Sequence, residues 1–468
     1  MRTSFASRLR GATILSAAVL GAGLIVSTGA HAQSSTTPPG YFFTLGDPLK
    51  SFGDQMANYG IYFNAANVNV VYDNVSGGRK TGVSDTNDAS AGMDFDMTKL
   101  AGIPGARAHI QFDDRAAGFN GNYSGSVWGS SPEYGPVEVF QLSELSWEQS
   151  LFDDHLRLYA GRISPLGDFS TFDVYCNFYS IGVCGNGPAG YYFDNSATYS
   201  PVSTWGFRAT VKPTLSTYIR AGVYADDDAA YYTTHSHGFT DWGLSQASGV
   251  FIPFQIGYDS ITQNYPTHVM LGGYYDSSNY SVGATGTPAA IVAGSANAAL
   301  NNQRGRGSVY MGLEQTVWKP DPKSDRQLIA FGEATWSVMG QAPIENAQVV
   351  GLVLQGPFAS RPHDTVNFAW DFAKYNHRFA QAAAFGAGYD NGGGIGVMQA
   401  TPSENWIEFS YSAAVMPGFS IQPFLQYFTN PEMAVSNANI HHDSFTIGVA
   451  TVVVLNGLLG LPGLGHSN

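Results

Sequence analysis

The stretch FSIQPFLQYFTNPE (419–432) contains the residue pattern that decides the fold. Every second residue from Phe419 to position 427 is apolar, whereas the positions between them include Gln422 and Gln426. This period of two predicts a β-strand with one apolar face and one face that carries amides. Pro423 lacks a backbone N–H, so we expect it to lose one ladder bond at a local irregularity such as a bulge. Such a strand separates an apolar medium from a polar one.

Four other segments show the same alternation: 106–113, 204–211, 216–224 and 405–412. In each segment, apolar residues share one face, and the other face carries side chains such as arginine, glutamine, glutamate and tyrosine. A wall between lipid and a water-filled lumen has this pattern. Only helices and closed barrels satisfy every backbone polar group in lipid. The sequence therefore predicts an all-β fold, a closed transmembrane antiparallel barrel.

About sixteen strand-like runs follow one another, and short turns alternate with long connections rich in Gly, Asn, Ser and Asp. Outer-membrane barrels have short periplasmic turns, long extracellular loops and spanning strands of about 9–11 residues. About sixteen strands also leave a water-filled channel. The expected strands are 60–72, 89–99, 106–114, 138–149, 155–163, 203–211, 215–224, 249–259, 265–275, 306–318, 326–338, 347–357, 362–372, 403–415, 419–428 and 443–455. The expected long connections are 73–88, 115–137, 164–202, 225–248, 276–305 and 373–402.

The composition fits a chain surrounded by outer-membrane lipid. Charged residues make up 12% of the 468 residues, about half of the roughly 25% that is usual. The 36 Asp and Glu outnumber the 22 Lys and Arg, and this acidic balance argues against a nucleic-acid partner.

The N-terminus has the three parts of a secretory signal peptide. Arg2, Arg8 and Arg10 precede the apolar run ATILSAAVLGAGLIV, and a small-x-small triplet ends at Ala32. This order predicts export with cleavage after Ala32, and an uncleaved membrane anchor is the alternative. The expected location is the Gram-negative outer membrane. The predicted organisation is a signal peptide (1–32), an N-terminal periplasmic segment (33–58), a barrel (59–455) and a C-terminal tail (456–468).

Both cysteines of the chain, Cys176 and Cys184, fall in the long connection 164–202. In an exported protein two cysteines this close predict a disulfide, and a pair of free thiols is the alternative. A loop of this length can fold into a barrel and narrow it, as in porins generally, or it can be a stapled surface loop. No metal-ligand spacing surrounds the cysteines, so we expect no metal.

Several motifs in order along the chain resemble those of the carbohydrate-selective porins of the OprB family. They are SFGDQMANYGIYF (51–63), ELSWEQSLFDDHLRLYAGR (144–162), GRGSVYMGLEQTVWKP (305–320), RPHD (361–364) and IQPFLQYFTNP (421–431). The resemblance implies a sixteen-stranded outer-membrane porin that passes glucose and other small sugars by diffusion, without a cofactor. Unlike many such barrels, the last expected strand stops at Leu455 without a terminal aromatic residue. A homotrimer and a monomer are both compatible with the sequence.

A sugar-selective channel needs hydrogen-bonding groups for hydroxyls and aromatic surface for the ring, and it must bind weakly enough to release. Arginine offers several donors in a fixed fork and keeps its charge. The alternative for each such residue is a polar side chain that only holds water and its neighbours. The candidate lumen residues are Arg107, Arg157, Arg208, Arg220, Glu408, Gln422, Gln426, Trp406, Tyr218 and Tyr224.

Two other functions share parts of this pattern. A secreted β-rich glycoside hydrolase would need two carboxylates about 5–10 Å apart, and DFD (94–96), FDD (112–114) and ADDD (225–228) offer acids. The sequence has no G-x-S-x-G, H-E-x-x-H or Walker A motif, so an enzyme is not expected. A non-transport adhesin or structural barrel would share the fold but show no sugar-dependent conductance.

Overall fold

The computed structural model describes most of the expected barrel. The described residues are 37–119, 123–126, 139–165, 167–180, 182–184, 194–227, 239, 242–244, 247–260, 265–282, 301–376, 399–400, 402–431, 434–435 and 443–464. The expected signal peptide (1–32) lies outside them. No helix among these residues is both long enough and apolar enough to span a membrane.

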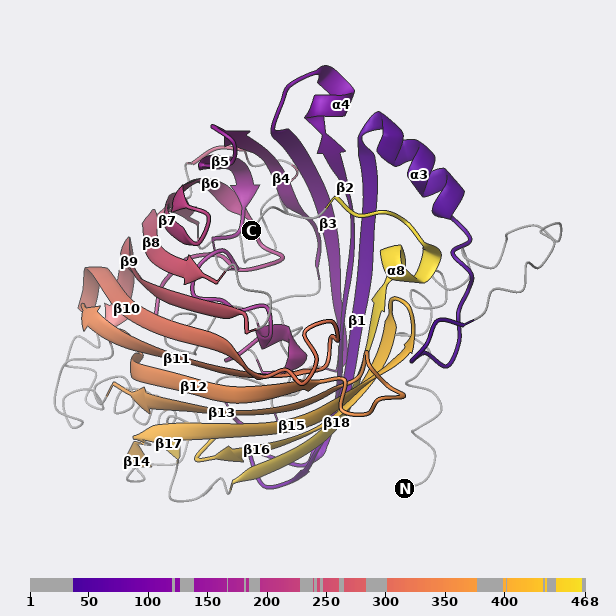
Figure 1. Ribbon diagram of the computed structural model, residues 1–468. Coiled ribbons are helices and arrows are strands. Elements are labelled where there is room, and N and C mark those ends of the chain that lie inside the picture. Colours follow the sequence, from indigo (N-terminus) through magenta and orange to yellow (C-terminus); the bar gives the residue numbers. More distant parts are fainter. Residues whose placement is uncertain are drawn as a thin grey trace.

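Within the described residues, sixteen antiparallel strands form a closed barrel, in which β1 pairs with both β2 and β18 (Figure 1). Two further short strands, β14 (Gln399–Ala400) and β17 (Ala434–Val435), pair outside the barrel. The predicted fold is therefore confirmed. The barrel strands are β1 (Ile61–Ser76), β2 (Gly82–Asp96), β3 (Ala106–Phe119), β4 (Val139–Leu151), β5 (Leu156–Ile163), β6 (Thr204–Thr214), β7 (Thr217–Asp226), β8 (Gly249–Asp259), β9 (Thr267–Val282), β10 (Asn301–Trp318), β11 (Gln327–Met339), β12 (Ile344–Gln355), β13 (Thr365–Tyr375), β15 (Ser403–Met416), β16 (Phe419–Thr429) and β18 (Ser444–Val454).

The two faces of β16 are those that the alternation predicts. Leu425 is 45% exposed on the outer face, whereas Phe424 and Gln426 are buried on the inner face. The expected irregularity at Pro423 is a gap in the ladder and not a bulge. Its pairing with Val449 on β18 continues without a register shift, whereas the β15 ladder is interrupted between Ser410↔Phe424 and Ala413↔Ile421. The proline ring can remain there because only its own N–H is missing from the ladder.

The first hairpin differs from the expected loop at 73–88. Strand β2 begins at Gly82 rather than near 89, and it pairs with β1 from Ile61↔Phe95 to Asn74↔Gly82. The connection is reduced to residues 77–81. The segment GVSDTNDASAG has the Gly, Ser, Asn and Asp content of a turn, but the ladder with β1 supplies the hydrogen bonds that local propensity does not.

Short helices lie at the periplasmic end, where the turns are short. Helix α3 (Lys50–Tyr59) leads into β1, α4 (Met97–Ala101) joins β2 to β3, and α8 (Leu455–Leu459) follows β18 (Figure 1). Asp96 caps α4 by accepting a hydrogen bond from the Thr98 N–H at 3.0 Å. This cap satisfies a backbone donor that the helix leaves unpaired.

The RPHD motif clamps the N-terminal segment onto this end of the barrel. Arg361 holds Asp364 through two hydrogen bonds of 2.9 and 2.8 Å. The same guanidinium donates to the carbonyl oxygens of Gly40 and Ala414, both at 2.7 Å, and lies 4.0 Å from the centre of the Phe42 ring. Arg361 therefore joins three segments: the start of the described chain, the β12–β13 turn and the end of β15.

We expect Arg361→Ala to free the N-terminal segment from the rim. Each hydrogen bond of a charged group contributes about 1.5–3 kcal/mol net, so the free energy of unfolding should fall by roughly 2 kcal/mol or more. Urea titration in lipid vesicles and limited proteolysis of residues 40–49 would measure the two effects. Lys374→Ala is the matched control, since its ion pair with Glu345 is exposed and should be worth less than about 1 kcal/mol. Equal losses in both variants would contradict the clamp.

Candidate functional site

The described part of the connection between β5 and β6, which includes residues 167–180, lies inside the barrel against the inner wall. Loop residues Phe169 and Phe178 are completely buried. The Phe178 ring centre lies 5.7 Å from that of Phe331 on β11 and 6.4 Å from that of Trp406 on β15. This apolar cluster is the core of the protein, and it is formed between the loop and the wall.

One carboxylate of the wall holds the first part of the loop. Glu333, buried on β11, accepts hydrogen bonds from the Ser170 hydroxyl and from the Tyr175 hydroxyl. The Ser170 N–H donates to Gln255 Oε1 on β8 at 3.1 Å. These bonds fix the loop across the barrel because their partners come from two strands that are not adjacent.

A second carboxylate holds the middle of the loop. The Tyr179 N–H donates to both oxygens of Glu408, at 3.2 and 3.0 Å, and Gln426 Nε2 donates to the same carboxylate at 2.8 Å. Gln422 Nε2 donates to the Asn177 carbonyl at 2.7 Å. The predicted lumen residues Glu408, Gln422 and Gln426 do point inward, and the structure places them against the loop.

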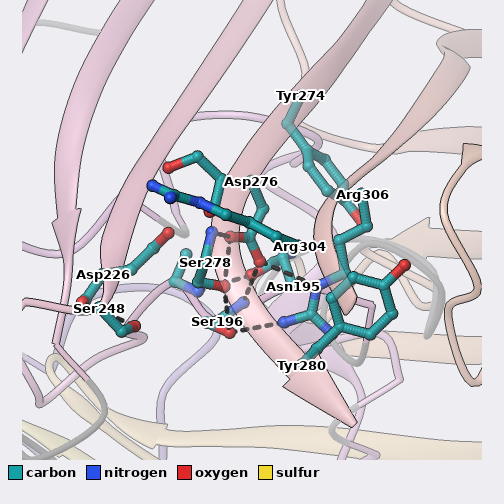
Figure 2. A network of polar contacts seen from close by, with 12 residues as sticks. Asn195, Ser196, Asp226, Ser248, Tyr274, Asp276, Ser278, Tyr280, Arg304 and Arg306 are labelled. Carbon is teal, nitrogen blue, oxygen red and sulfur yellow. Dashed lines mark hydrogen bonds and ion pairs between the residues drawn. The ribbon is translucent and has the colours of Figure 1, made fainter. Parts of the chain in front are cut away.

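The returning part of the loop is fixed by a polar network on β9 and β10 (Figure 2). Arg306 Nε lies 2.9 Å from Asp276 Oδ2, and the Ser196 N–H donates to the same oxygen at 2.8 Å. Ser278 Oγ donates to Ser196 Oγ at 2.9 Å. Sequence reasoning did not identify this network, although charged residues inside a strand, such as Arg306, are a signal for it.

Cys176 and Cys184 are joined in a disulfide, with their Cα atoms 4.4 Å apart. The ring that they close contains Phe178 and Tyr179, two of the residues that contact the wall. A disulfide reduces the conformational freedom of such a short segment before it docks. In the structure, it belongs to the part of the loop inside the barrel.

Two predicted arginines meet the loop at one point. Arg208 on β6 forms an ion pair with Asp168 of the loop, and its guanidinium lies 4.7 Å from the centre of the Tyr159 ring. Arg220 on β7 donates to the Asp168 carbonyl and lies 5.3 Å from the Tyr218 ring. We call Asp168, Arg208, Arg220, Tyr159 and Tyr218 the arginine cluster.

A row of charged side chains continues from the arginine cluster along β2 to β5. The Tyr159 hydroxyl donates to Glu144, and its ring centre lies 6.4 Å from that of His109. His109 Nδ1 lies 2.7 Å from Asp94 Oδ1, and its Nε2 lies 3.8 Å from Glu148 Oε2. The alternation at 106–113 puts His109 on the polar face of its strand, and Asp94 belongs to DFD (94–96), but sequence reasoning did not bring these residues together, because only the barrel places the four strands side by side.

The other candidates lie elsewhere. Arg157 bonds Asp154 in the β4–β5 turn. The hydrogen bond from Arg157 is the main reason that the pKa of Asp154 is lowered to about 2. The ion pair is therefore kept as the pH falls and is lost only near pH 2.

The remaining candidates lie on three other strands. Arg107 is the second residue of β3, near the periplasmic end. Tyr224 is buried 6.5 Å from the Phe251 ring, and the completely buried Trp406 packs on the loop.

The closed sixteen-stranded barrel and the loop fixed inside it define the class of this protein: an outer-membrane porin, a channel and not an enzyme. The chain belongs to the carbohydrate-selective porins of the OprB family, whose family profile matches residues 80–454. The predicted family is thereby confirmed.

Two relatives and one solved structure are similar to this chain. The chain is 23% identical to Porin B of Pseudomonas aeruginosa over 388 residues, 78% of this chain and 81% of that protein. It is 22% identical to a putative porin, QuiX, of Acinetobacter baylyi over 438 residues, 89% of this chain and 94% of that protein. A high-pH structure of Pseudomonas putida OprB has a TM-score of 0.76 at 19% identity and covers 89% of this chain and 99% of its own. This last likeness supports the fold.

Proposed function

We propose that the arginine cluster is the constriction where this carbohydrate-selective porin contacts glucose and other small sugars. The observation that carries the proposal is that two guanidinium groups and two phenol rings meet where the loop touches β5, β6 and β7. Passage is by passive diffusion and needs no cofactor. Each barrel encloses its own pathway, so the activity is compatible with a monomer and with a homotrimer.

The chemistry of the cluster matches that of a sugar. A guanidinium has five N–H donors, and Asp168 engages Arg208 through Nη1, so donors remain for solute hydroxyls. The faces of the Tyr159 and Tyr218 rings suit the apolar face of a pyranose. Arg208 is 11% exposed at its side chain, so a passing solute reaches only an edge of it. Such partial contact favours weak, reversible binding, which a channel requires.

Liposome swelling with the refolded protein tests the proposed selectivity. We expect glucose to enter faster than a zwitterion of similar size, with a disaccharide entering more slowly than glucose. Equal rates for glucose and the zwitterion would show that the cluster does not select sugars. No influx of any solute would favour a structural or adhesive barrel.

Replacement of Arg208 by Ala should weaken sugar binding in the channel with little effect on assembly. The loss of one charge-assisted hydrogen bond, worth about 1.5–3 kcal/mol, corresponds to roughly tenfold or more in affinity. Inhibition of ion current by glucose in planar bilayers would measure it. Arg157→Ala is the control, because Arg157 lies at the periplasmic end of β5, where it pairs with Asp154 of the β4–β5 turn. Unchanged sugar block in the Arg208 variant would place the constriction elsewhere.

The proposed route to the outer membrane begins with the signal peptide at 1–32. The Arg-rich start, the apolar run and the A-x-A triplet support cleavage after Ala32. Segment 33–58 is then periplasmic, in keeping with the position of α3 beside the start of β1. Determination of the N-terminus of the protein isolated from outer membranes tests this, with Gln33 expected as the first residue.

A further inference from the structure

The long connection between β7 and β8 reaches strands that it does not join. Among its described residues, Phe239 stacks on Phe112 of β3 and on Phe140 of β4, with ring centres 6.1 and 5.8 Å apart. Trp205 Nε1 of β6 donates to the Trp242 carbonyl at 3.0 Å, and the two indole rings lie 5.7 Å apart. The described part of this connection therefore extends along the barrel from β6 to β3.

The rings that it contacts lie on the lipid-facing side of the wall. His109 is buried in the lumen, and side chains alternate along a strand, so Phe112, three positions further along β3, points outward. Arg208 of the arginine cluster points inward, so Trp205, three positions before it on β6, also points outward. Phe140 is 56% exposed. The connection therefore contacts the outside of the barrel.

These contacts lie at the extracellular end of the wall. The short β4–β5 and β6–β7 turns are periplasmic, so β4 and β6 begin on the extracellular side. Phe140 is the second residue of β4, and Trp205 is the second residue of β6. In an outer-membrane barrel this end of the apolar band lies in the outer leaflet, where a girdle of aromatic residues meets the headgroups.

The wall at this level is shielded from lipid. Leu142 lies in register with Phe112 and is 5% exposed, and Arg162 lies in register with Trp205 and is 7% exposed. By contrast Phe207, the next outward residue of β6 toward the periplasm, is 42% exposed. A guanidinium on the lipid face is costly where it meets hydrocarbon, so a cover over this end of β5 has a physical reason.

The connection exposes apolar side chains of its own. Phe239, Trp242 and Leu244 are 41%, 44% and 61% exposed, and we call these three residues the outer apolar patch. Trp242 Nε1 donates to the Phe239 carbonyl at 3.1 Å, so the indole ring can enter an apolar layer without an unpaired donor. Apolar surface of this kind is unfavourable in water, whereas at the outer leaflet it continues the lipid-facing wall.

We propose that the outer apolar patch docks the acyl chains of lipopolysaccharide, the glycolipid of the outer leaflet. The patch rests on Phe112, Phe140 and Trp205, so it is continuous with the surface that already faces lipid. Acyl chains fit it because its three side chains are apolar. Its position at the extracellular end favours the outer-leaflet glycolipid over the phospholipid of the inner leaflet. The proposal depends on the barrel and is independent of the sugar constriction.

Photo-cross-linking in intact outer membranes tests the contact. With p-benzoylphenylalanine in place of Phe239, we expect irradiation to give an adduct that an antibody to lipopolysaccharide detects. The same photoreactive residue in place of Phe152 is the matched control, because Phe152 is 74% exposed in the periplasmic β4–β5 turn and should give no such adduct. No lipopolysaccharide adduct at position 239, equal adducts at both positions, or an adduct with phospholipid or protein alone would overturn the proposal.

A second measurement separates lipid binding from folding. Lipopolysaccharide added to the refolded protein in detergent should raise the Tm of the wild type, because a ligand that binds the folded state stabilises it. The double variant Trp242→Ser, Leu244→Ser should lose most of this rise and keep the glucose influx of the wild type. Leu215→Ser, in the periplasmic β6–β7 turn, is the control and should keep the rise. A wild type without the rise, or a double variant with the full rise, would contradict the proposal.

Discussion

Replacing both Glu333 and Glu408 by Ala is expected to increase single-channel conductance several-fold and to abolish the preference for sugars. These carboxylates accept hydrogen bonds from Ser170, Tyr175 and Tyr179 of the loop. Each of these hydrogen bonds contributes about 0.5–1.5 kcal/mol net. Their removal also leaves buried donors without acceptors, so the loop should leave the wall for a large part of the time.

Planar-bilayer recordings would measure the conductance, and liposome swelling would compare glucose with a zwitterion. Glu345→Ala is the matched control, since that carboxylate is exposed and bonds only Lys374 among the described contacts. If the double variant conducts as the wild type does, the apolar cluster around Phe178 and Trp406 is sufficient to hold the loop.

Replacing Ile219 by Arg should prevent or strongly impair insertion. Ile219 is 48% exposed, and its register neighbours Val211 and Ile256 are also outward and apolar. An arginine on the lipid face near mid-bilayer costs on the order of 2–4 kcal/mol. The variant should therefore fold in vesicles at lower yield and unfold at lower urea concentration.

The same new residue at a different depth is the control for this result. Leu215 lies in the β6–β7 turn and is 82% exposed. Arginine there should cost roughly 0–1 kcal/mol, because the side chain reaches water at the interface. Equal effects of Ile219→Arg and Leu215→Arg would show that depth in the bilayer is not what matters, and the assignment of the outer face of β7 would be wrong.

Much of the barrel could be predicted because each strand residue faces either lipid or the lumen, so apolar and polar residues alternate along the strand. The alternation at 204–211, 216–224 and 419–428 predicted the strands β6, β7 and β16 and which of their residues point outward. The same reasoning was wrong for the first half of β2. There the outward face carries Asn87 and Asp85 in place of apolar residues, so the period-two signal is absent, and only pairing with β1 makes the segment a strand.

The site was less accessible to sequence reasoning. Arg208, Arg220 and Tyr218 were identified as inward residues, and they do lie together. That Glu408 and Gln422 hold a loop could not be derived, because their partners Tyr179 and Asn177 are more than 220 positions away in the chain. The row of charged residues from Asp94 to Glu148 could not be derived for the same reason, because strand pairing in the barrel brings these residues together.

The sequence by itself determined the medium on each side of the wall, the number of strands and the family, because hydrophobic burial in lipid acts on every second residue independently of what lies elsewhere. The tertiary structure alone decided where the described part of the loop 164–202 docks and which polar lumen residues hold it. These features depend on contacts between residues far apart in the chain, and such contacts produce no periodic pattern in the sequence.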